Sequence, residues 1–435
     1  MTKTANPQTI GKYTLVTELG RGPASIVYYA HDPFADRDVA IKLLDHAAFA
    51  NEAALKNAKQ QFLAKASIAG KLNHPHIVNV YDAQAHNNQT YIVMELINGA
   101  SLEDRAVPER LLPVEKVMQL IYKCATALDF ACNEGVIHRD IKLANIILSL
   151  DNEIKITDFG AAVLQNPVEI PQANAGTPAY MSPEQALDSV LSHQTDIYSL
   201  GVVMFKLLTG RFPHEADSVE QLKQKILHGE PLKIRALRPE IPEEIAKVVH
   251  SAIEKDTSMR YLHWADFVRD LAASEQSIGA KDKQVSDSEK INTLKSLEFF
   301  DGFSDVELWE VLSISQWGKF SAGKTLVKEG EFGNSFFLLA KGQVNVLKND
   351  TKLTAISKGG CFGEMAYIDK ENALRTASIF SISPVTLVKI NSIALEKASN
   401  NLQLRFNRAF LKILVRRLAD ANAELVGDFI ATDVD

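Results

Sequence analysis

The chain has 435 residues, of which 46% are hydrophobic and 23% are charged, and its formal net charge is −7. This length suggests two or three domains, and the composition is that of a folded soluble protein. The acidic balance gives no reason to expect nucleic-acid binding, and no apolar run is long enough to span a membrane. The first residues lack the apolar core of a signal peptide, and three cysteines without metal-ligand spacing fit a reducing compartment. We therefore expect a cytoplasmic protein.

The first predicted elements are strands over residues 10–30, where apolar residues alternate around the turn L-G-R-G-P-A-S-I-V at positions 19–27. Gly20 and Gly22 have no Cβ, so the backbone of this turn could close over phosphate groups. A further strand ends in V-A-I-K at Lys42. Taken alone, a plain hairpin turn and a solvated edge lysine explain these features equally well.

A helical pattern over residues 114–135 is followed by H-R-D-I-K-L-A-N at 138–145, an apolar strand-like run, and D-F-G at 158–160. These groups suit phosphoryl transfer: Asp140 could orient and deprotonate an acceptor hydroxyl, and Lys142 could offset charge on the moving phosphoryl group. Asn145 and Asp158 could hold Mg²⁺. The two motifs occur in this order and 18 residues apart (158 minus 140), which is far more specific than either alone. The stretch resembles the catalytic core of eukaryotic-like (Hanks-type) serine/threonine protein kinases.

This resemblance implies an α+β chain with a bilobal protein-kinase fold over residues 10–272, which transfers the γ-phosphate of ATP to serine or threonine hydroxyls of protein substrates. Asp140 and Lys142 would be the catalytic residues, and Asn145 and Asp158 would bind the magnesium ion. The ATP-binding residues that the resemblance implies are Leu19, Gly20, Gly22, Val27, Ala40, Lys42, Met94, Glu95 and Ile97.

The segment F-L-A-K-A at residues 62–66 departs from the family pattern. Members of the family carry a glutamate here that pairs with the strand lysine, whereas this chain has Lys65, and no Asp or Glu occurs between residues 53 and 81. The like charges of Lys65 and Lys42 would repel each other. Either Lys65 points outward and Lys42 leans on Asp158 and the nucleotide, or ATP handling is impaired. The second option leaves a pseudokinase scaffold as an alternative function.

The segment that follows D-F-G also departs from the family. Residues 161–175 contain no Ser, Thr or Tyr, so the phosphorylation that often activates relatives has no acceptor there. We expect regulation to come from elsewhere in the chain. By resemblance, Thr177 would contact Asp140 and Lys142.

Three further residues are expected to support the fold. The family pattern implies that Asp196 anchors the catalytic loop and that Glu184 pairs with Arg260. We therefore expect these side chains to be structural rather than catalytic.

The second half of the chain begins with a polar, charged stretch at residues 273–290, which predicts an exposed linker. Short alternating strands with glycine turns over 317–390 predict a small β-barrel or jelly roll, and flanking helices are expected near 291–312 and 392–427. An apolar stripe with interspersed basic residues at 404–418 predicts packing on the barrel or on a partner helix.

The sequence C-F-G-E-M-A-Y-I at 361–368, followed by L-R-T-A-S at 374–378, resembles the phosphate-binding cassette of cyclic-nucleotide-binding domains. Gly363 and neighbouring N–H groups could cradle a cyclic phosphate, and Arg375 could pair with it. Glu364 could accept a ribose hydroxyl, and the hydroxyl of Thr376 favours cGMP. A buried Arg–Glu structural pair is the alternative interpretation.

The two resemblances together predict a serine/threonine protein kinase whose domain at 291–427 binds a cyclic nucleotide, cAMP or cGMP, and regulates the kinase. A pseudokinase scaffold, or a kinase with a C-terminal docking or dimerisation module, are the alternatives. The sequence leaves the protein substrate, the nucleotide and the oligomeric state open.

Overall fold

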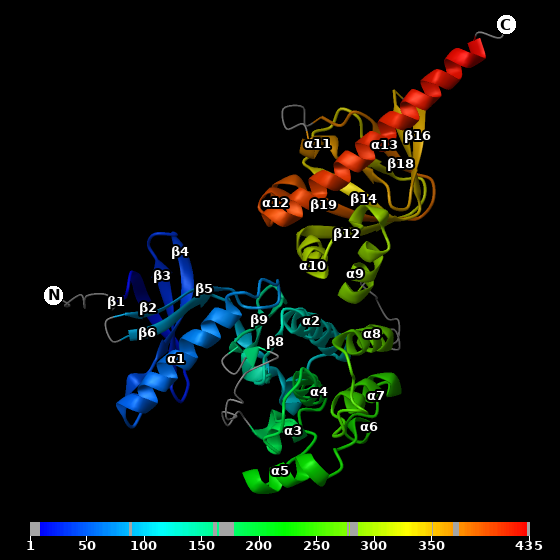
Figure 1. Ribbon diagram of the computed structural model, residues 1–435. Helices are drawn as coiled ribbons and strands as arrows, with labels where there is room; N and C mark the ends of the chain where they lie inside the picture. The colour runs from blue at the N-terminus through cyan, green and yellow to red at the C-terminus, as the bar shows by residue number, and fades with distance from the viewer. Residues whose placement is uncertain are drawn as a thin grey trace. The chain divides into compact units, whose positions relative to one another are not determined.

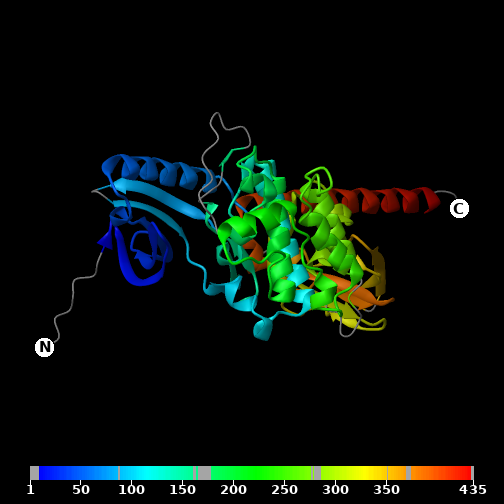
Figure 2. The same cartoon turned by 90° about the horizontal axis from the view of Figure 1, so that it is seen from below.

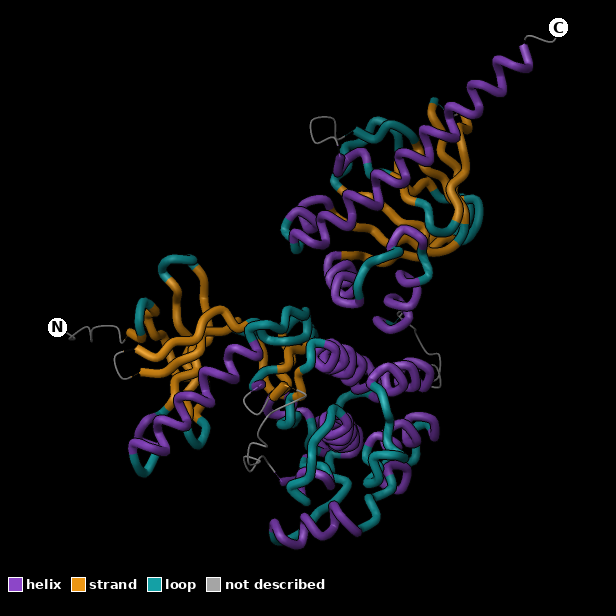
Figure 3. The backbone as a smooth tube through the Cα atoms, viewed as in Figure 1, coloured by secondary structure: helices purple, strands orange, loops and turns teal. Residues whose placement is uncertain are grey.

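The computed structural model describes residues 9–86, 89–159, 163–164, 178–275, 278, 286–349, 351–368 and 374–432. The chain divides into two compact units, Met1–Asp282 and Lys283–Asp435. The predicted α+β class is confirmed, because strands form the start of the first unit and the centre of the second, while helices form most of the remainder (Figure 3). The boundary between the units lies inside the predicted linker 273–290, whose two ends are helical.

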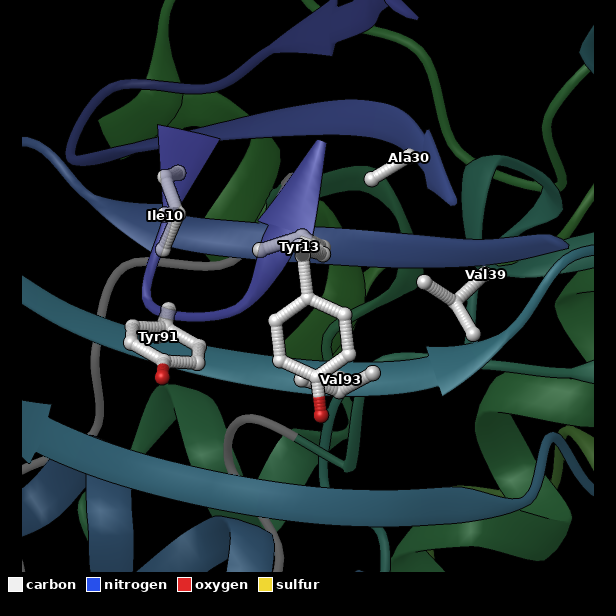
Figure 4. Close-up of a cluster of buried hydrophobic side chains, with 7 residues drawn as sticks. Ile10, Tyr13, Ala30, Val39, Tyr91 and Val93 are labelled. Carbon is white, nitrogen blue, oxygen red and sulfur yellow. The ribbon is translucent and has the colours of Figure 1, made fainter. Parts of the chain in front are cut away.

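The first unit begins with a six-stranded antiparallel sheet whose β-branched and aromatic residues suit strands. In spatial order its strands are β1 (Thr9–Ile10), β2 (Tyr13–Arg21), β3 (Ser25–Asp32), β4 (Arg37–Leu44), β6 (Gln89–Glu95) and β5 (Val80–His86). One buried cluster on this sheet, drawn in Figure 4, is Ile10, Tyr13, Ala30, Val39, Ile41, Tyr91 and Val93. Within it the rings of Tyr13 and Tyr91 meet edge to face with centroids 6.2 Å apart.

Helix α1 (Glu52–Ala69) lies along this sheet against β5 (Figures 1 and 2). Its sequence is rich in Ala, Lys, Gln and Leu, which are strong helix formers. Asn51 caps its start, because the Asn51 side chain accepts a hydrogen bond of 2.8 Å from the backbone N–H of Ala54. The helix thus begins well before the position at which family members carry their glutamate.

The larger lobe of the first unit is mainly helical. Its elements are β7 (Gly99–Ser101), α2 (Val114–Asn133), β8 (Val136–Ile137), β9 (Ile146–Ser149), β10 (Ile154–Ile156), β11 (Val163–Leu164), α3 (Pro183–Ala186), α4 (Gln194–Thr209), α5 (Val219–His228), α6 (Ile234–Leu237), α7 (Glu243–Ala252) and α8 (Trp264–Glu275). Helix α4 is buried along nearly its whole length. A Cβ on Gly201 would lie 2.8 Å from the Ala252 Cβ, so α4 and the end of α7 approach as closely as a glycine permits.

The two lobes are joined through β10. The backbone N–H of Ile156 donates to the His76 carbonyl at 2.8 Å, and the Ile156 carbonyl accepts from the Val78 N–H at 2.9 Å. Both partners belong to the H-P-H-I-V turn between α1 and β5. The strand that leads into D-F-G is therefore fixed directly to the chain that follows α1.

The second unit contains two four-stranded antiparallel sheets, which confirms the expected small β-domain with flanking helices. One sheet is β12 (Ser315–Phe320), β19 (Val385–Asn391), β14 (Ser335–Lys341) and β17 (Cys361–Phe362), and the other is β13 (Thr325–Val327), β18 (Ser378–Ser381), β15 (Gln343–Lys348) and β16 (Thr351–Ser357). The helices are α9 (Asp287–Lys295), α10 (Asp305–Ile314), α11 (Met365–Ile368), α12 (Ser392–Glu396) and α13 (Asn400–Thr432).

The long helix α13 runs past the sheets (Figure 1) and packs through phenylalanines near its start. Phe406 and Phe410 contact Phe336 of β14 with ring centroids 5.7 and 5.0 Å away. Other members of this aromatic cluster are Phe299, Phe300, Phe303 and Tyr367. The predicted packing of the apolar stripe on the barrel therefore holds for part of the helix, whereas Leu411, Val415 and Leu418 remain exposed.

The aromatic cluster generates a prediction for stability. Replacing Phe406 with alanine should lower the free energy of unfolding of the second unit by about 3–5 kcal/mol, because a fully buried ring leaves a cavity. Calorimetric unfolding of the full chain should show this as a shift of one transition. Leu404→Ala on the same helix, where the side chain is 50% exposed, is the control and should change little. Equal effects of the two substitutions would contradict the packing described here.

Candidate functional site

The glycine-rich turn joins β2 to β3 and is closed by its own backbone. The N–H of Gly22 donates to the carbonyl of Ser25 at 2.8 Å, so the residue in the position of the family's third glycine contributes through its main chain. A Cβ on Gly20 would meet no atom within 4 Å. The turn is therefore open on this side, where a ligand could approach.

Sheet register brings together several residues that the sequence predicts to bind ATP. Val27 pairs with Gly20 on one neighbouring strand and with Lys42 on the other. Ala40 pairs with Met94. These five residues consequently share one region of the sheet, next to the exposed side chain of Leu19 in β2.

Glu95 and Ile97 lie where the sheet leads into the larger lobe. The carboxylate of Glu95 accepts from Lys155 Nζ at 2.8 Å and from Asn79 Nδ2 at 3.0 Å. Its backbone N–H donates to the Asn79 carbonyl at 2.9 Å. The Glu95 side chain thus braces this connection, a role that the sequence reasoning missed, while Ile97 is half-buried two residues later.

Lys42 forms an ion pair with Asp158. Burial raises the pKa of the Asp158 carboxyl, but the adjacent Lys42 ammonium outweighs this effect and holds that pKa below its ordinary value. Asp158 therefore stays ionised at neutral pH. Lys42 is thus paired with Asp158, as one of the two alternatives from the sequence proposed for a chain without the family's glutamate.

Lys65 faces the cleft, which excludes the outward orientation that one of the two alternatives from the sequence required. It lines a cavity of about 60 Å³ together with Lys42 and Asp158, and Met94 lies in the same wall. The pKa of Lys65 is lowered, first by desolvation and then by the charge of Lys42. The inward direction follows from the helix register, since the buried residues Ala66 and Ala69 place this face of α1 toward the sheet.

The catalytic loop places Asp140 between two donors. Lys142 Nζ donates to the Asp140 carboxylate at 2.8 Å, and Asn145 Nδ2 donates to the same carboxylate at 3.1 Å. Asn145 Nδ2 also bonds the Asp140 carbonyl at 2.8 Å. The three residues form one hydrogen-bonded group that fixes the carboxylate in a single orientation.

His138 braces the loop rather than facing the cleft. Its ring is fully buried, with Nε2 3.2 Å from the Thr157 carbonyl and Nδ1 accepting from the Asp140 N–H at 3.2 Å. It also contacts the Phe159 ring with centroids 4.4 Å apart. The H-R-D and D-F-G motifs are thereby joined through one side chain.

The catalytic loop is held by a side chain of α4. Asp196 accepts hydrogen bonds from the backbone N–H groups of His138 at 2.7 Å and Arg139 at 2.8 Å. Arg260 donates to Glu184 at 2.7 and 3.1 Å. Both contacts are those that the sequence predicts for these structural residues.

Asn145 and Asp158 provide oxygen ligands of the kind that Mg²⁺ prefers. They lie close in the fold, because the N–H of Thr157 donates to the Asn145 carbonyl at 2.9 Å. Within the described residues no cluster of three or more His, Cys, Asp or Glu side chains is present. This donor set fits an ion held by one carboxylate, one amide and substrate phosphates. The predicted contact of Thr177, and most of residues 161–175, lie outside the described residues.

The four cassette residues Gly363, Glu364, Arg375 and Thr376 line one cavity of about 1220 Å³ in the second unit. Arg375 donates to the Ser335 carbonyl at 2.6 Å and to the Gly363 carbonyl at 3.1 Å. These four residues thus lie around one cavity, as their resemblance to a cyclic-nucleotide-binding cassette implies, and phosphate binding by Arg375 stays a prediction.

Glycines make room for the Arg375 guanidinium. A Cβ on Gly333 would lie 2.1 Å from Arg375 Nε, and one on Gly363 would lie 2.6 Å from Nη1. Gly363 also has a φ of +78°, which side chains disfavour. The backbone conformation therefore requires glycine at 363, whereas a side chain at 333 would displace the Arg375 guanidinium from its present position.

Glu364 pairs with a residue that the sequence reasoning missed. Arg417 of α13 donates to the Glu364 carboxylate at 2.6 Å and also bonds the Cys361 carbonyl. Glu364 is 5% exposed and Arg417 is 43% exposed. An Arg–Glu pair thus exists, but its arginine comes from α13 and not from the cassette. The basic residues in the predicted helix 392–427 were the only sequence signal for it.

Comparison with known families agrees with this division of the chain. Residues 13–267 match the family model described as the protein kinase domain, and residues 317–401 match the one described as the cyclic nucleotide-binding domain.

Among curated proteins, serine/threonine-protein kinase PrkC of Bacillus subtilis is 31% identical over 289 residues, which cover 66% of this chain and 44% of PrkC. Serine/threonine-protein kinase PknB of Mycobacterium leprae is 34% identical over 275 residues, which cover 62% of this chain and 44% of PknB. The chain spans less than half the length of these curated relatives. In the part of the chain that the structure describes, no helix is both long and apolar enough to cross a membrane.

The Glu184–Arg260 pair generates a pH-dependent prediction. Burial raises the pKa of the Glu184 carboxyl, but the hydrogen bonds and charge of Arg260 hold it below the ordinary value of 4.5. Arg260→Ala should lower the free energy of unfolding by about 3–5 kcal/mol near neutral pH, because a buried carboxylate loses its partner. The pair stabilises the fold above the ordinary pKa, and that contribution is lost as the pH falls through the lower folded-state pKa. The deficit of the variant should therefore shrink in acid.

Urea denaturation at neutral and acidic pH checks this prediction, with Trp264 fluorescence as the probe in a background carrying Trp309→Phe and Trp317→Phe. Arg235→Ala is the control, since its pair with Glu243 is about half exposed on both sides and spans 3.5 Å. It should cost at most about 1 kcal/mol. A deficit for Arg260→Ala that stays constant with pH would refute the assignment.

Proposed function

Because this chain belongs to the protein kinase family, we propose that it transfers the γ-phosphate of ATP to serine or threonine hydroxyls of other proteins. The observation that carries this proposal is the hydrogen-bonded group formed by Asp140, Lys142 and Asn145. It lies on a loop held by Asp196 and connected through His138 to Thr157, the residue before Asp158. This arrangement supplies a base, a cation and metal ligands in one place.

In the proposed reaction, Asp140 accepts the proton of the substrate hydroxyl as that oxygen attacks the γ-phosphorus. Lys142 and Asn145 donate hydrogen bonds to the Asp140 carboxylate and so hold it in one orientation toward the substrate hydroxyl. Lys142 also lies where it can offset negative charge on the transferred group. Its flexible ammonium reaches the carboxylate at 2.8 Å and can turn toward a phosphate oxygen.

Lys42 and the glycine-rich turn are assigned to the other phosphates of ATP. Lys42 is held by Asp158, so its ammonium is kept at the mouth of the cavity that Met94 also lines. Asn145 and Asp158 would hold Mg²⁺, which would supply positive charge to neutralise the phosphate groups. The remaining ATP contacts proposed are those of Leu19, Gly20, Gly22, Val27, Ala40, Glu95 and Ile97.

The second unit is proposed to bind a cyclic nucleotide and to change kinase output. Arg375 is the proposed phosphate ligand, because its guanidinium is fixed by carbonyl groups at the cavity wall. Binding can regulate the kinase only where the ligand prefers one conformation of the chain over another. A docking or dimerisation role for this unit remains the alternative.

A pseudokinase is the second candidate function, and Lys65 is the observation that favours it. A cation replaces the family's glutamate inside the cleft beside Lys42. The intact group around Asp140 opposes it. Phosphate transfer separates the two candidates.

Asp140→Asn should lower the rate of phosphate transfer by about 100- to 10,000-fold, because the substrate hydroxyl loses its base. The measurement is radiolabelled phosphate transfer from Mg·ATP to a basic protein and to the chain itself. Asp151→Asn, in an exposed turn, is the matched control and should leave the rate unchanged. Transfer that survives Asp140→Asn would refute the base assignment, and absence of transfer in the wild type would favour the pseudokinase.

Arg375→Ala should weaken the binding of cAMP or cGMP by about 10- to 100-fold, because a charged hydrogen-bond donor to the phosphate is lost. Isothermal titration calorimetry with each nucleotide measures this and identifies the preferred ligand. Lys352→Ala, which removes an exposed cation from β16, is the control. Undiminished binding by Arg375→Ala would overturn the site, and no binding by the wild type would favour the docking module.

A further inference from the structure

Helix α1 presents a lysine to the cleft at the place where the family carries an acid. Lys65 is half-buried and lines the same cavity as Lys42 and Asp158. Much of the remaining wall is apolar, with Phe62 and Val78 among its residues. A charged ammonium in such a position is costly unless a partner compensates it.

No such partner is present within the described residues, where Lys65 has no ion pair and no hydrogen bond. The carboxylates of Asp140 and Asp158 attract the Lys65 ammonium, but they are already paired with Lys142 and Lys42, respectively. Helix α1 offers no substitute, because Glu52 at its first turn is its only acidic residue. Lys65 therefore faces the cleft as a cation that has no ion pair or hydrogen bond of its own among the described residues.

The charge of the cleft changes accordingly. Three lysines (Lys42, Lys65 and Lys142) face two aspartates (Asp140 and Asp158), which gives a formal charge of 3 − 2 = +1. A glutamate in place of Lys65 would give 2 − 3 = −1. The substitution thus makes the site more positive by two charges, at the point where a polyphosphate is proposed to bind.

A bound polyphosphate supplies the charge that this cluster lacks. Desolvation and the repulsion from Lys42 both disfavour the Lys65 ammonium, as its lowered pKa reflects. Phosphate oxygens nearby would offset both effects, and a charged hydrogen bond contributes more than a neutral one.

We infer that Lys65 is a phosphate-binding residue that donates to an oxygen of bound ATP and takes over part of the charge neutralisation otherwise supplied by Mg²⁺. This inference rests on the proposed ATP binding at the first unit. Its consequence is that ATP binds with a weaker requirement for Mg²⁺ than it would with a glutamate at position 65. Lys65 thereby determines how tightly the site binds ATP that carries no metal ion.

The test measures the dissociation constant of a fluorescent ATP analogue by anisotropy, with the full chain, in excess EDTA and in excess Mg²⁺. Unlabelled ATP is then used in competition. The variants are Lys65→Gln, which removes the charge, Lys65→Arg, which keeps it, and Lys65→Glu, which reverses it. Lys56→Gln is the matched control, because it removes the same charge from an exposed position on the same helix.

In EDTA, Lys65→Gln should weaken binding by about 10- to 100-fold, because a charged hydrogen bond to the ligand is lost. Lys65→Arg and Lys56→Gln should bind within a few-fold of the wild type. Lys65→Glu should bind only when Mg²⁺ is present. The thermal unfolding temperature provides a second readout: since Lys65 lacks a partner within the described residues, its removal should not lower that temperature.

Three results would overturn the inference. Equal binding in EDTA by the wild type and Lys65→Gln would mean that Lys65 does not contact phosphate. Binding by the wild type in Mg²⁺ with none in EDTA would refute the inference and leave the proposed kinase function standing. Absence of binding in both conditions would refute ATP binding itself, so the two failures are distinguishable.

Discussion

The catalytic loop depends on one carboxylate. Asp196, on a helix that is buried along nearly its whole length, accepts the backbone N–H groups of both His138 and Arg139. Arg139 adopts a φ of +66°, a conformation that costs a non-glycine residue roughly 1–3 kcal/mol. Hydrogen bonds to a charged acceptor are strong enough to offset that cost. The orientation of Asp140, one residue further on, follows from this backbone conformation.

The same constraint acts on Asn145 and Asp158, the proposed metal ligands. Asp158 also has a positive φ, of +65°, and is joined to the loop through His138, Thr157 and Asn145. The larger lobe thus carries the proposed base and the proposed metal ligands, while the sheet of the small lobe carries Lys42 and the glycine-rich turn. The ion pair between Lys42 and Asp158 connects the two parts. Lys65 adds a positive charge beside that connection.

Local motifs with fixed spacing could be predicted from the sequence. The group around Asp140 follows from residues of one short loop. The anchor at Asp196, which lies 58 residues from His138, and the cassette around Arg375 could be predicted because their sequences match family patterns. Contacts that depend on how a helix docks could not be predicted. The orientation of Lys65 required the register of α1 against the sheet, and the pairing of Arg417 with Glu364 joins residues 53 positions apart. The split of α13 into a docked start and an exposed apolar stripe likewise depends on where the phenylalanines of β14 and the preceding segment lie.

The pairing of Arg417 with Glu364 affects the nucleotide concentration at which the second unit could respond. If Glu364 is to accept a ribose hydroxyl, the ligand must share or displace a guanidinium that belongs to α13. The apparent affinity is then the intrinsic affinity reduced by the fraction of molecules in which the carboxylate is accessible. A substitution on α13 could therefore raise or lower the half-maximal concentration while every residue of the cassette stays the same. Residues of α13 would then set the ligand concentration at which such a sensor responds, and residues of the cassette would determine which ligand it binds.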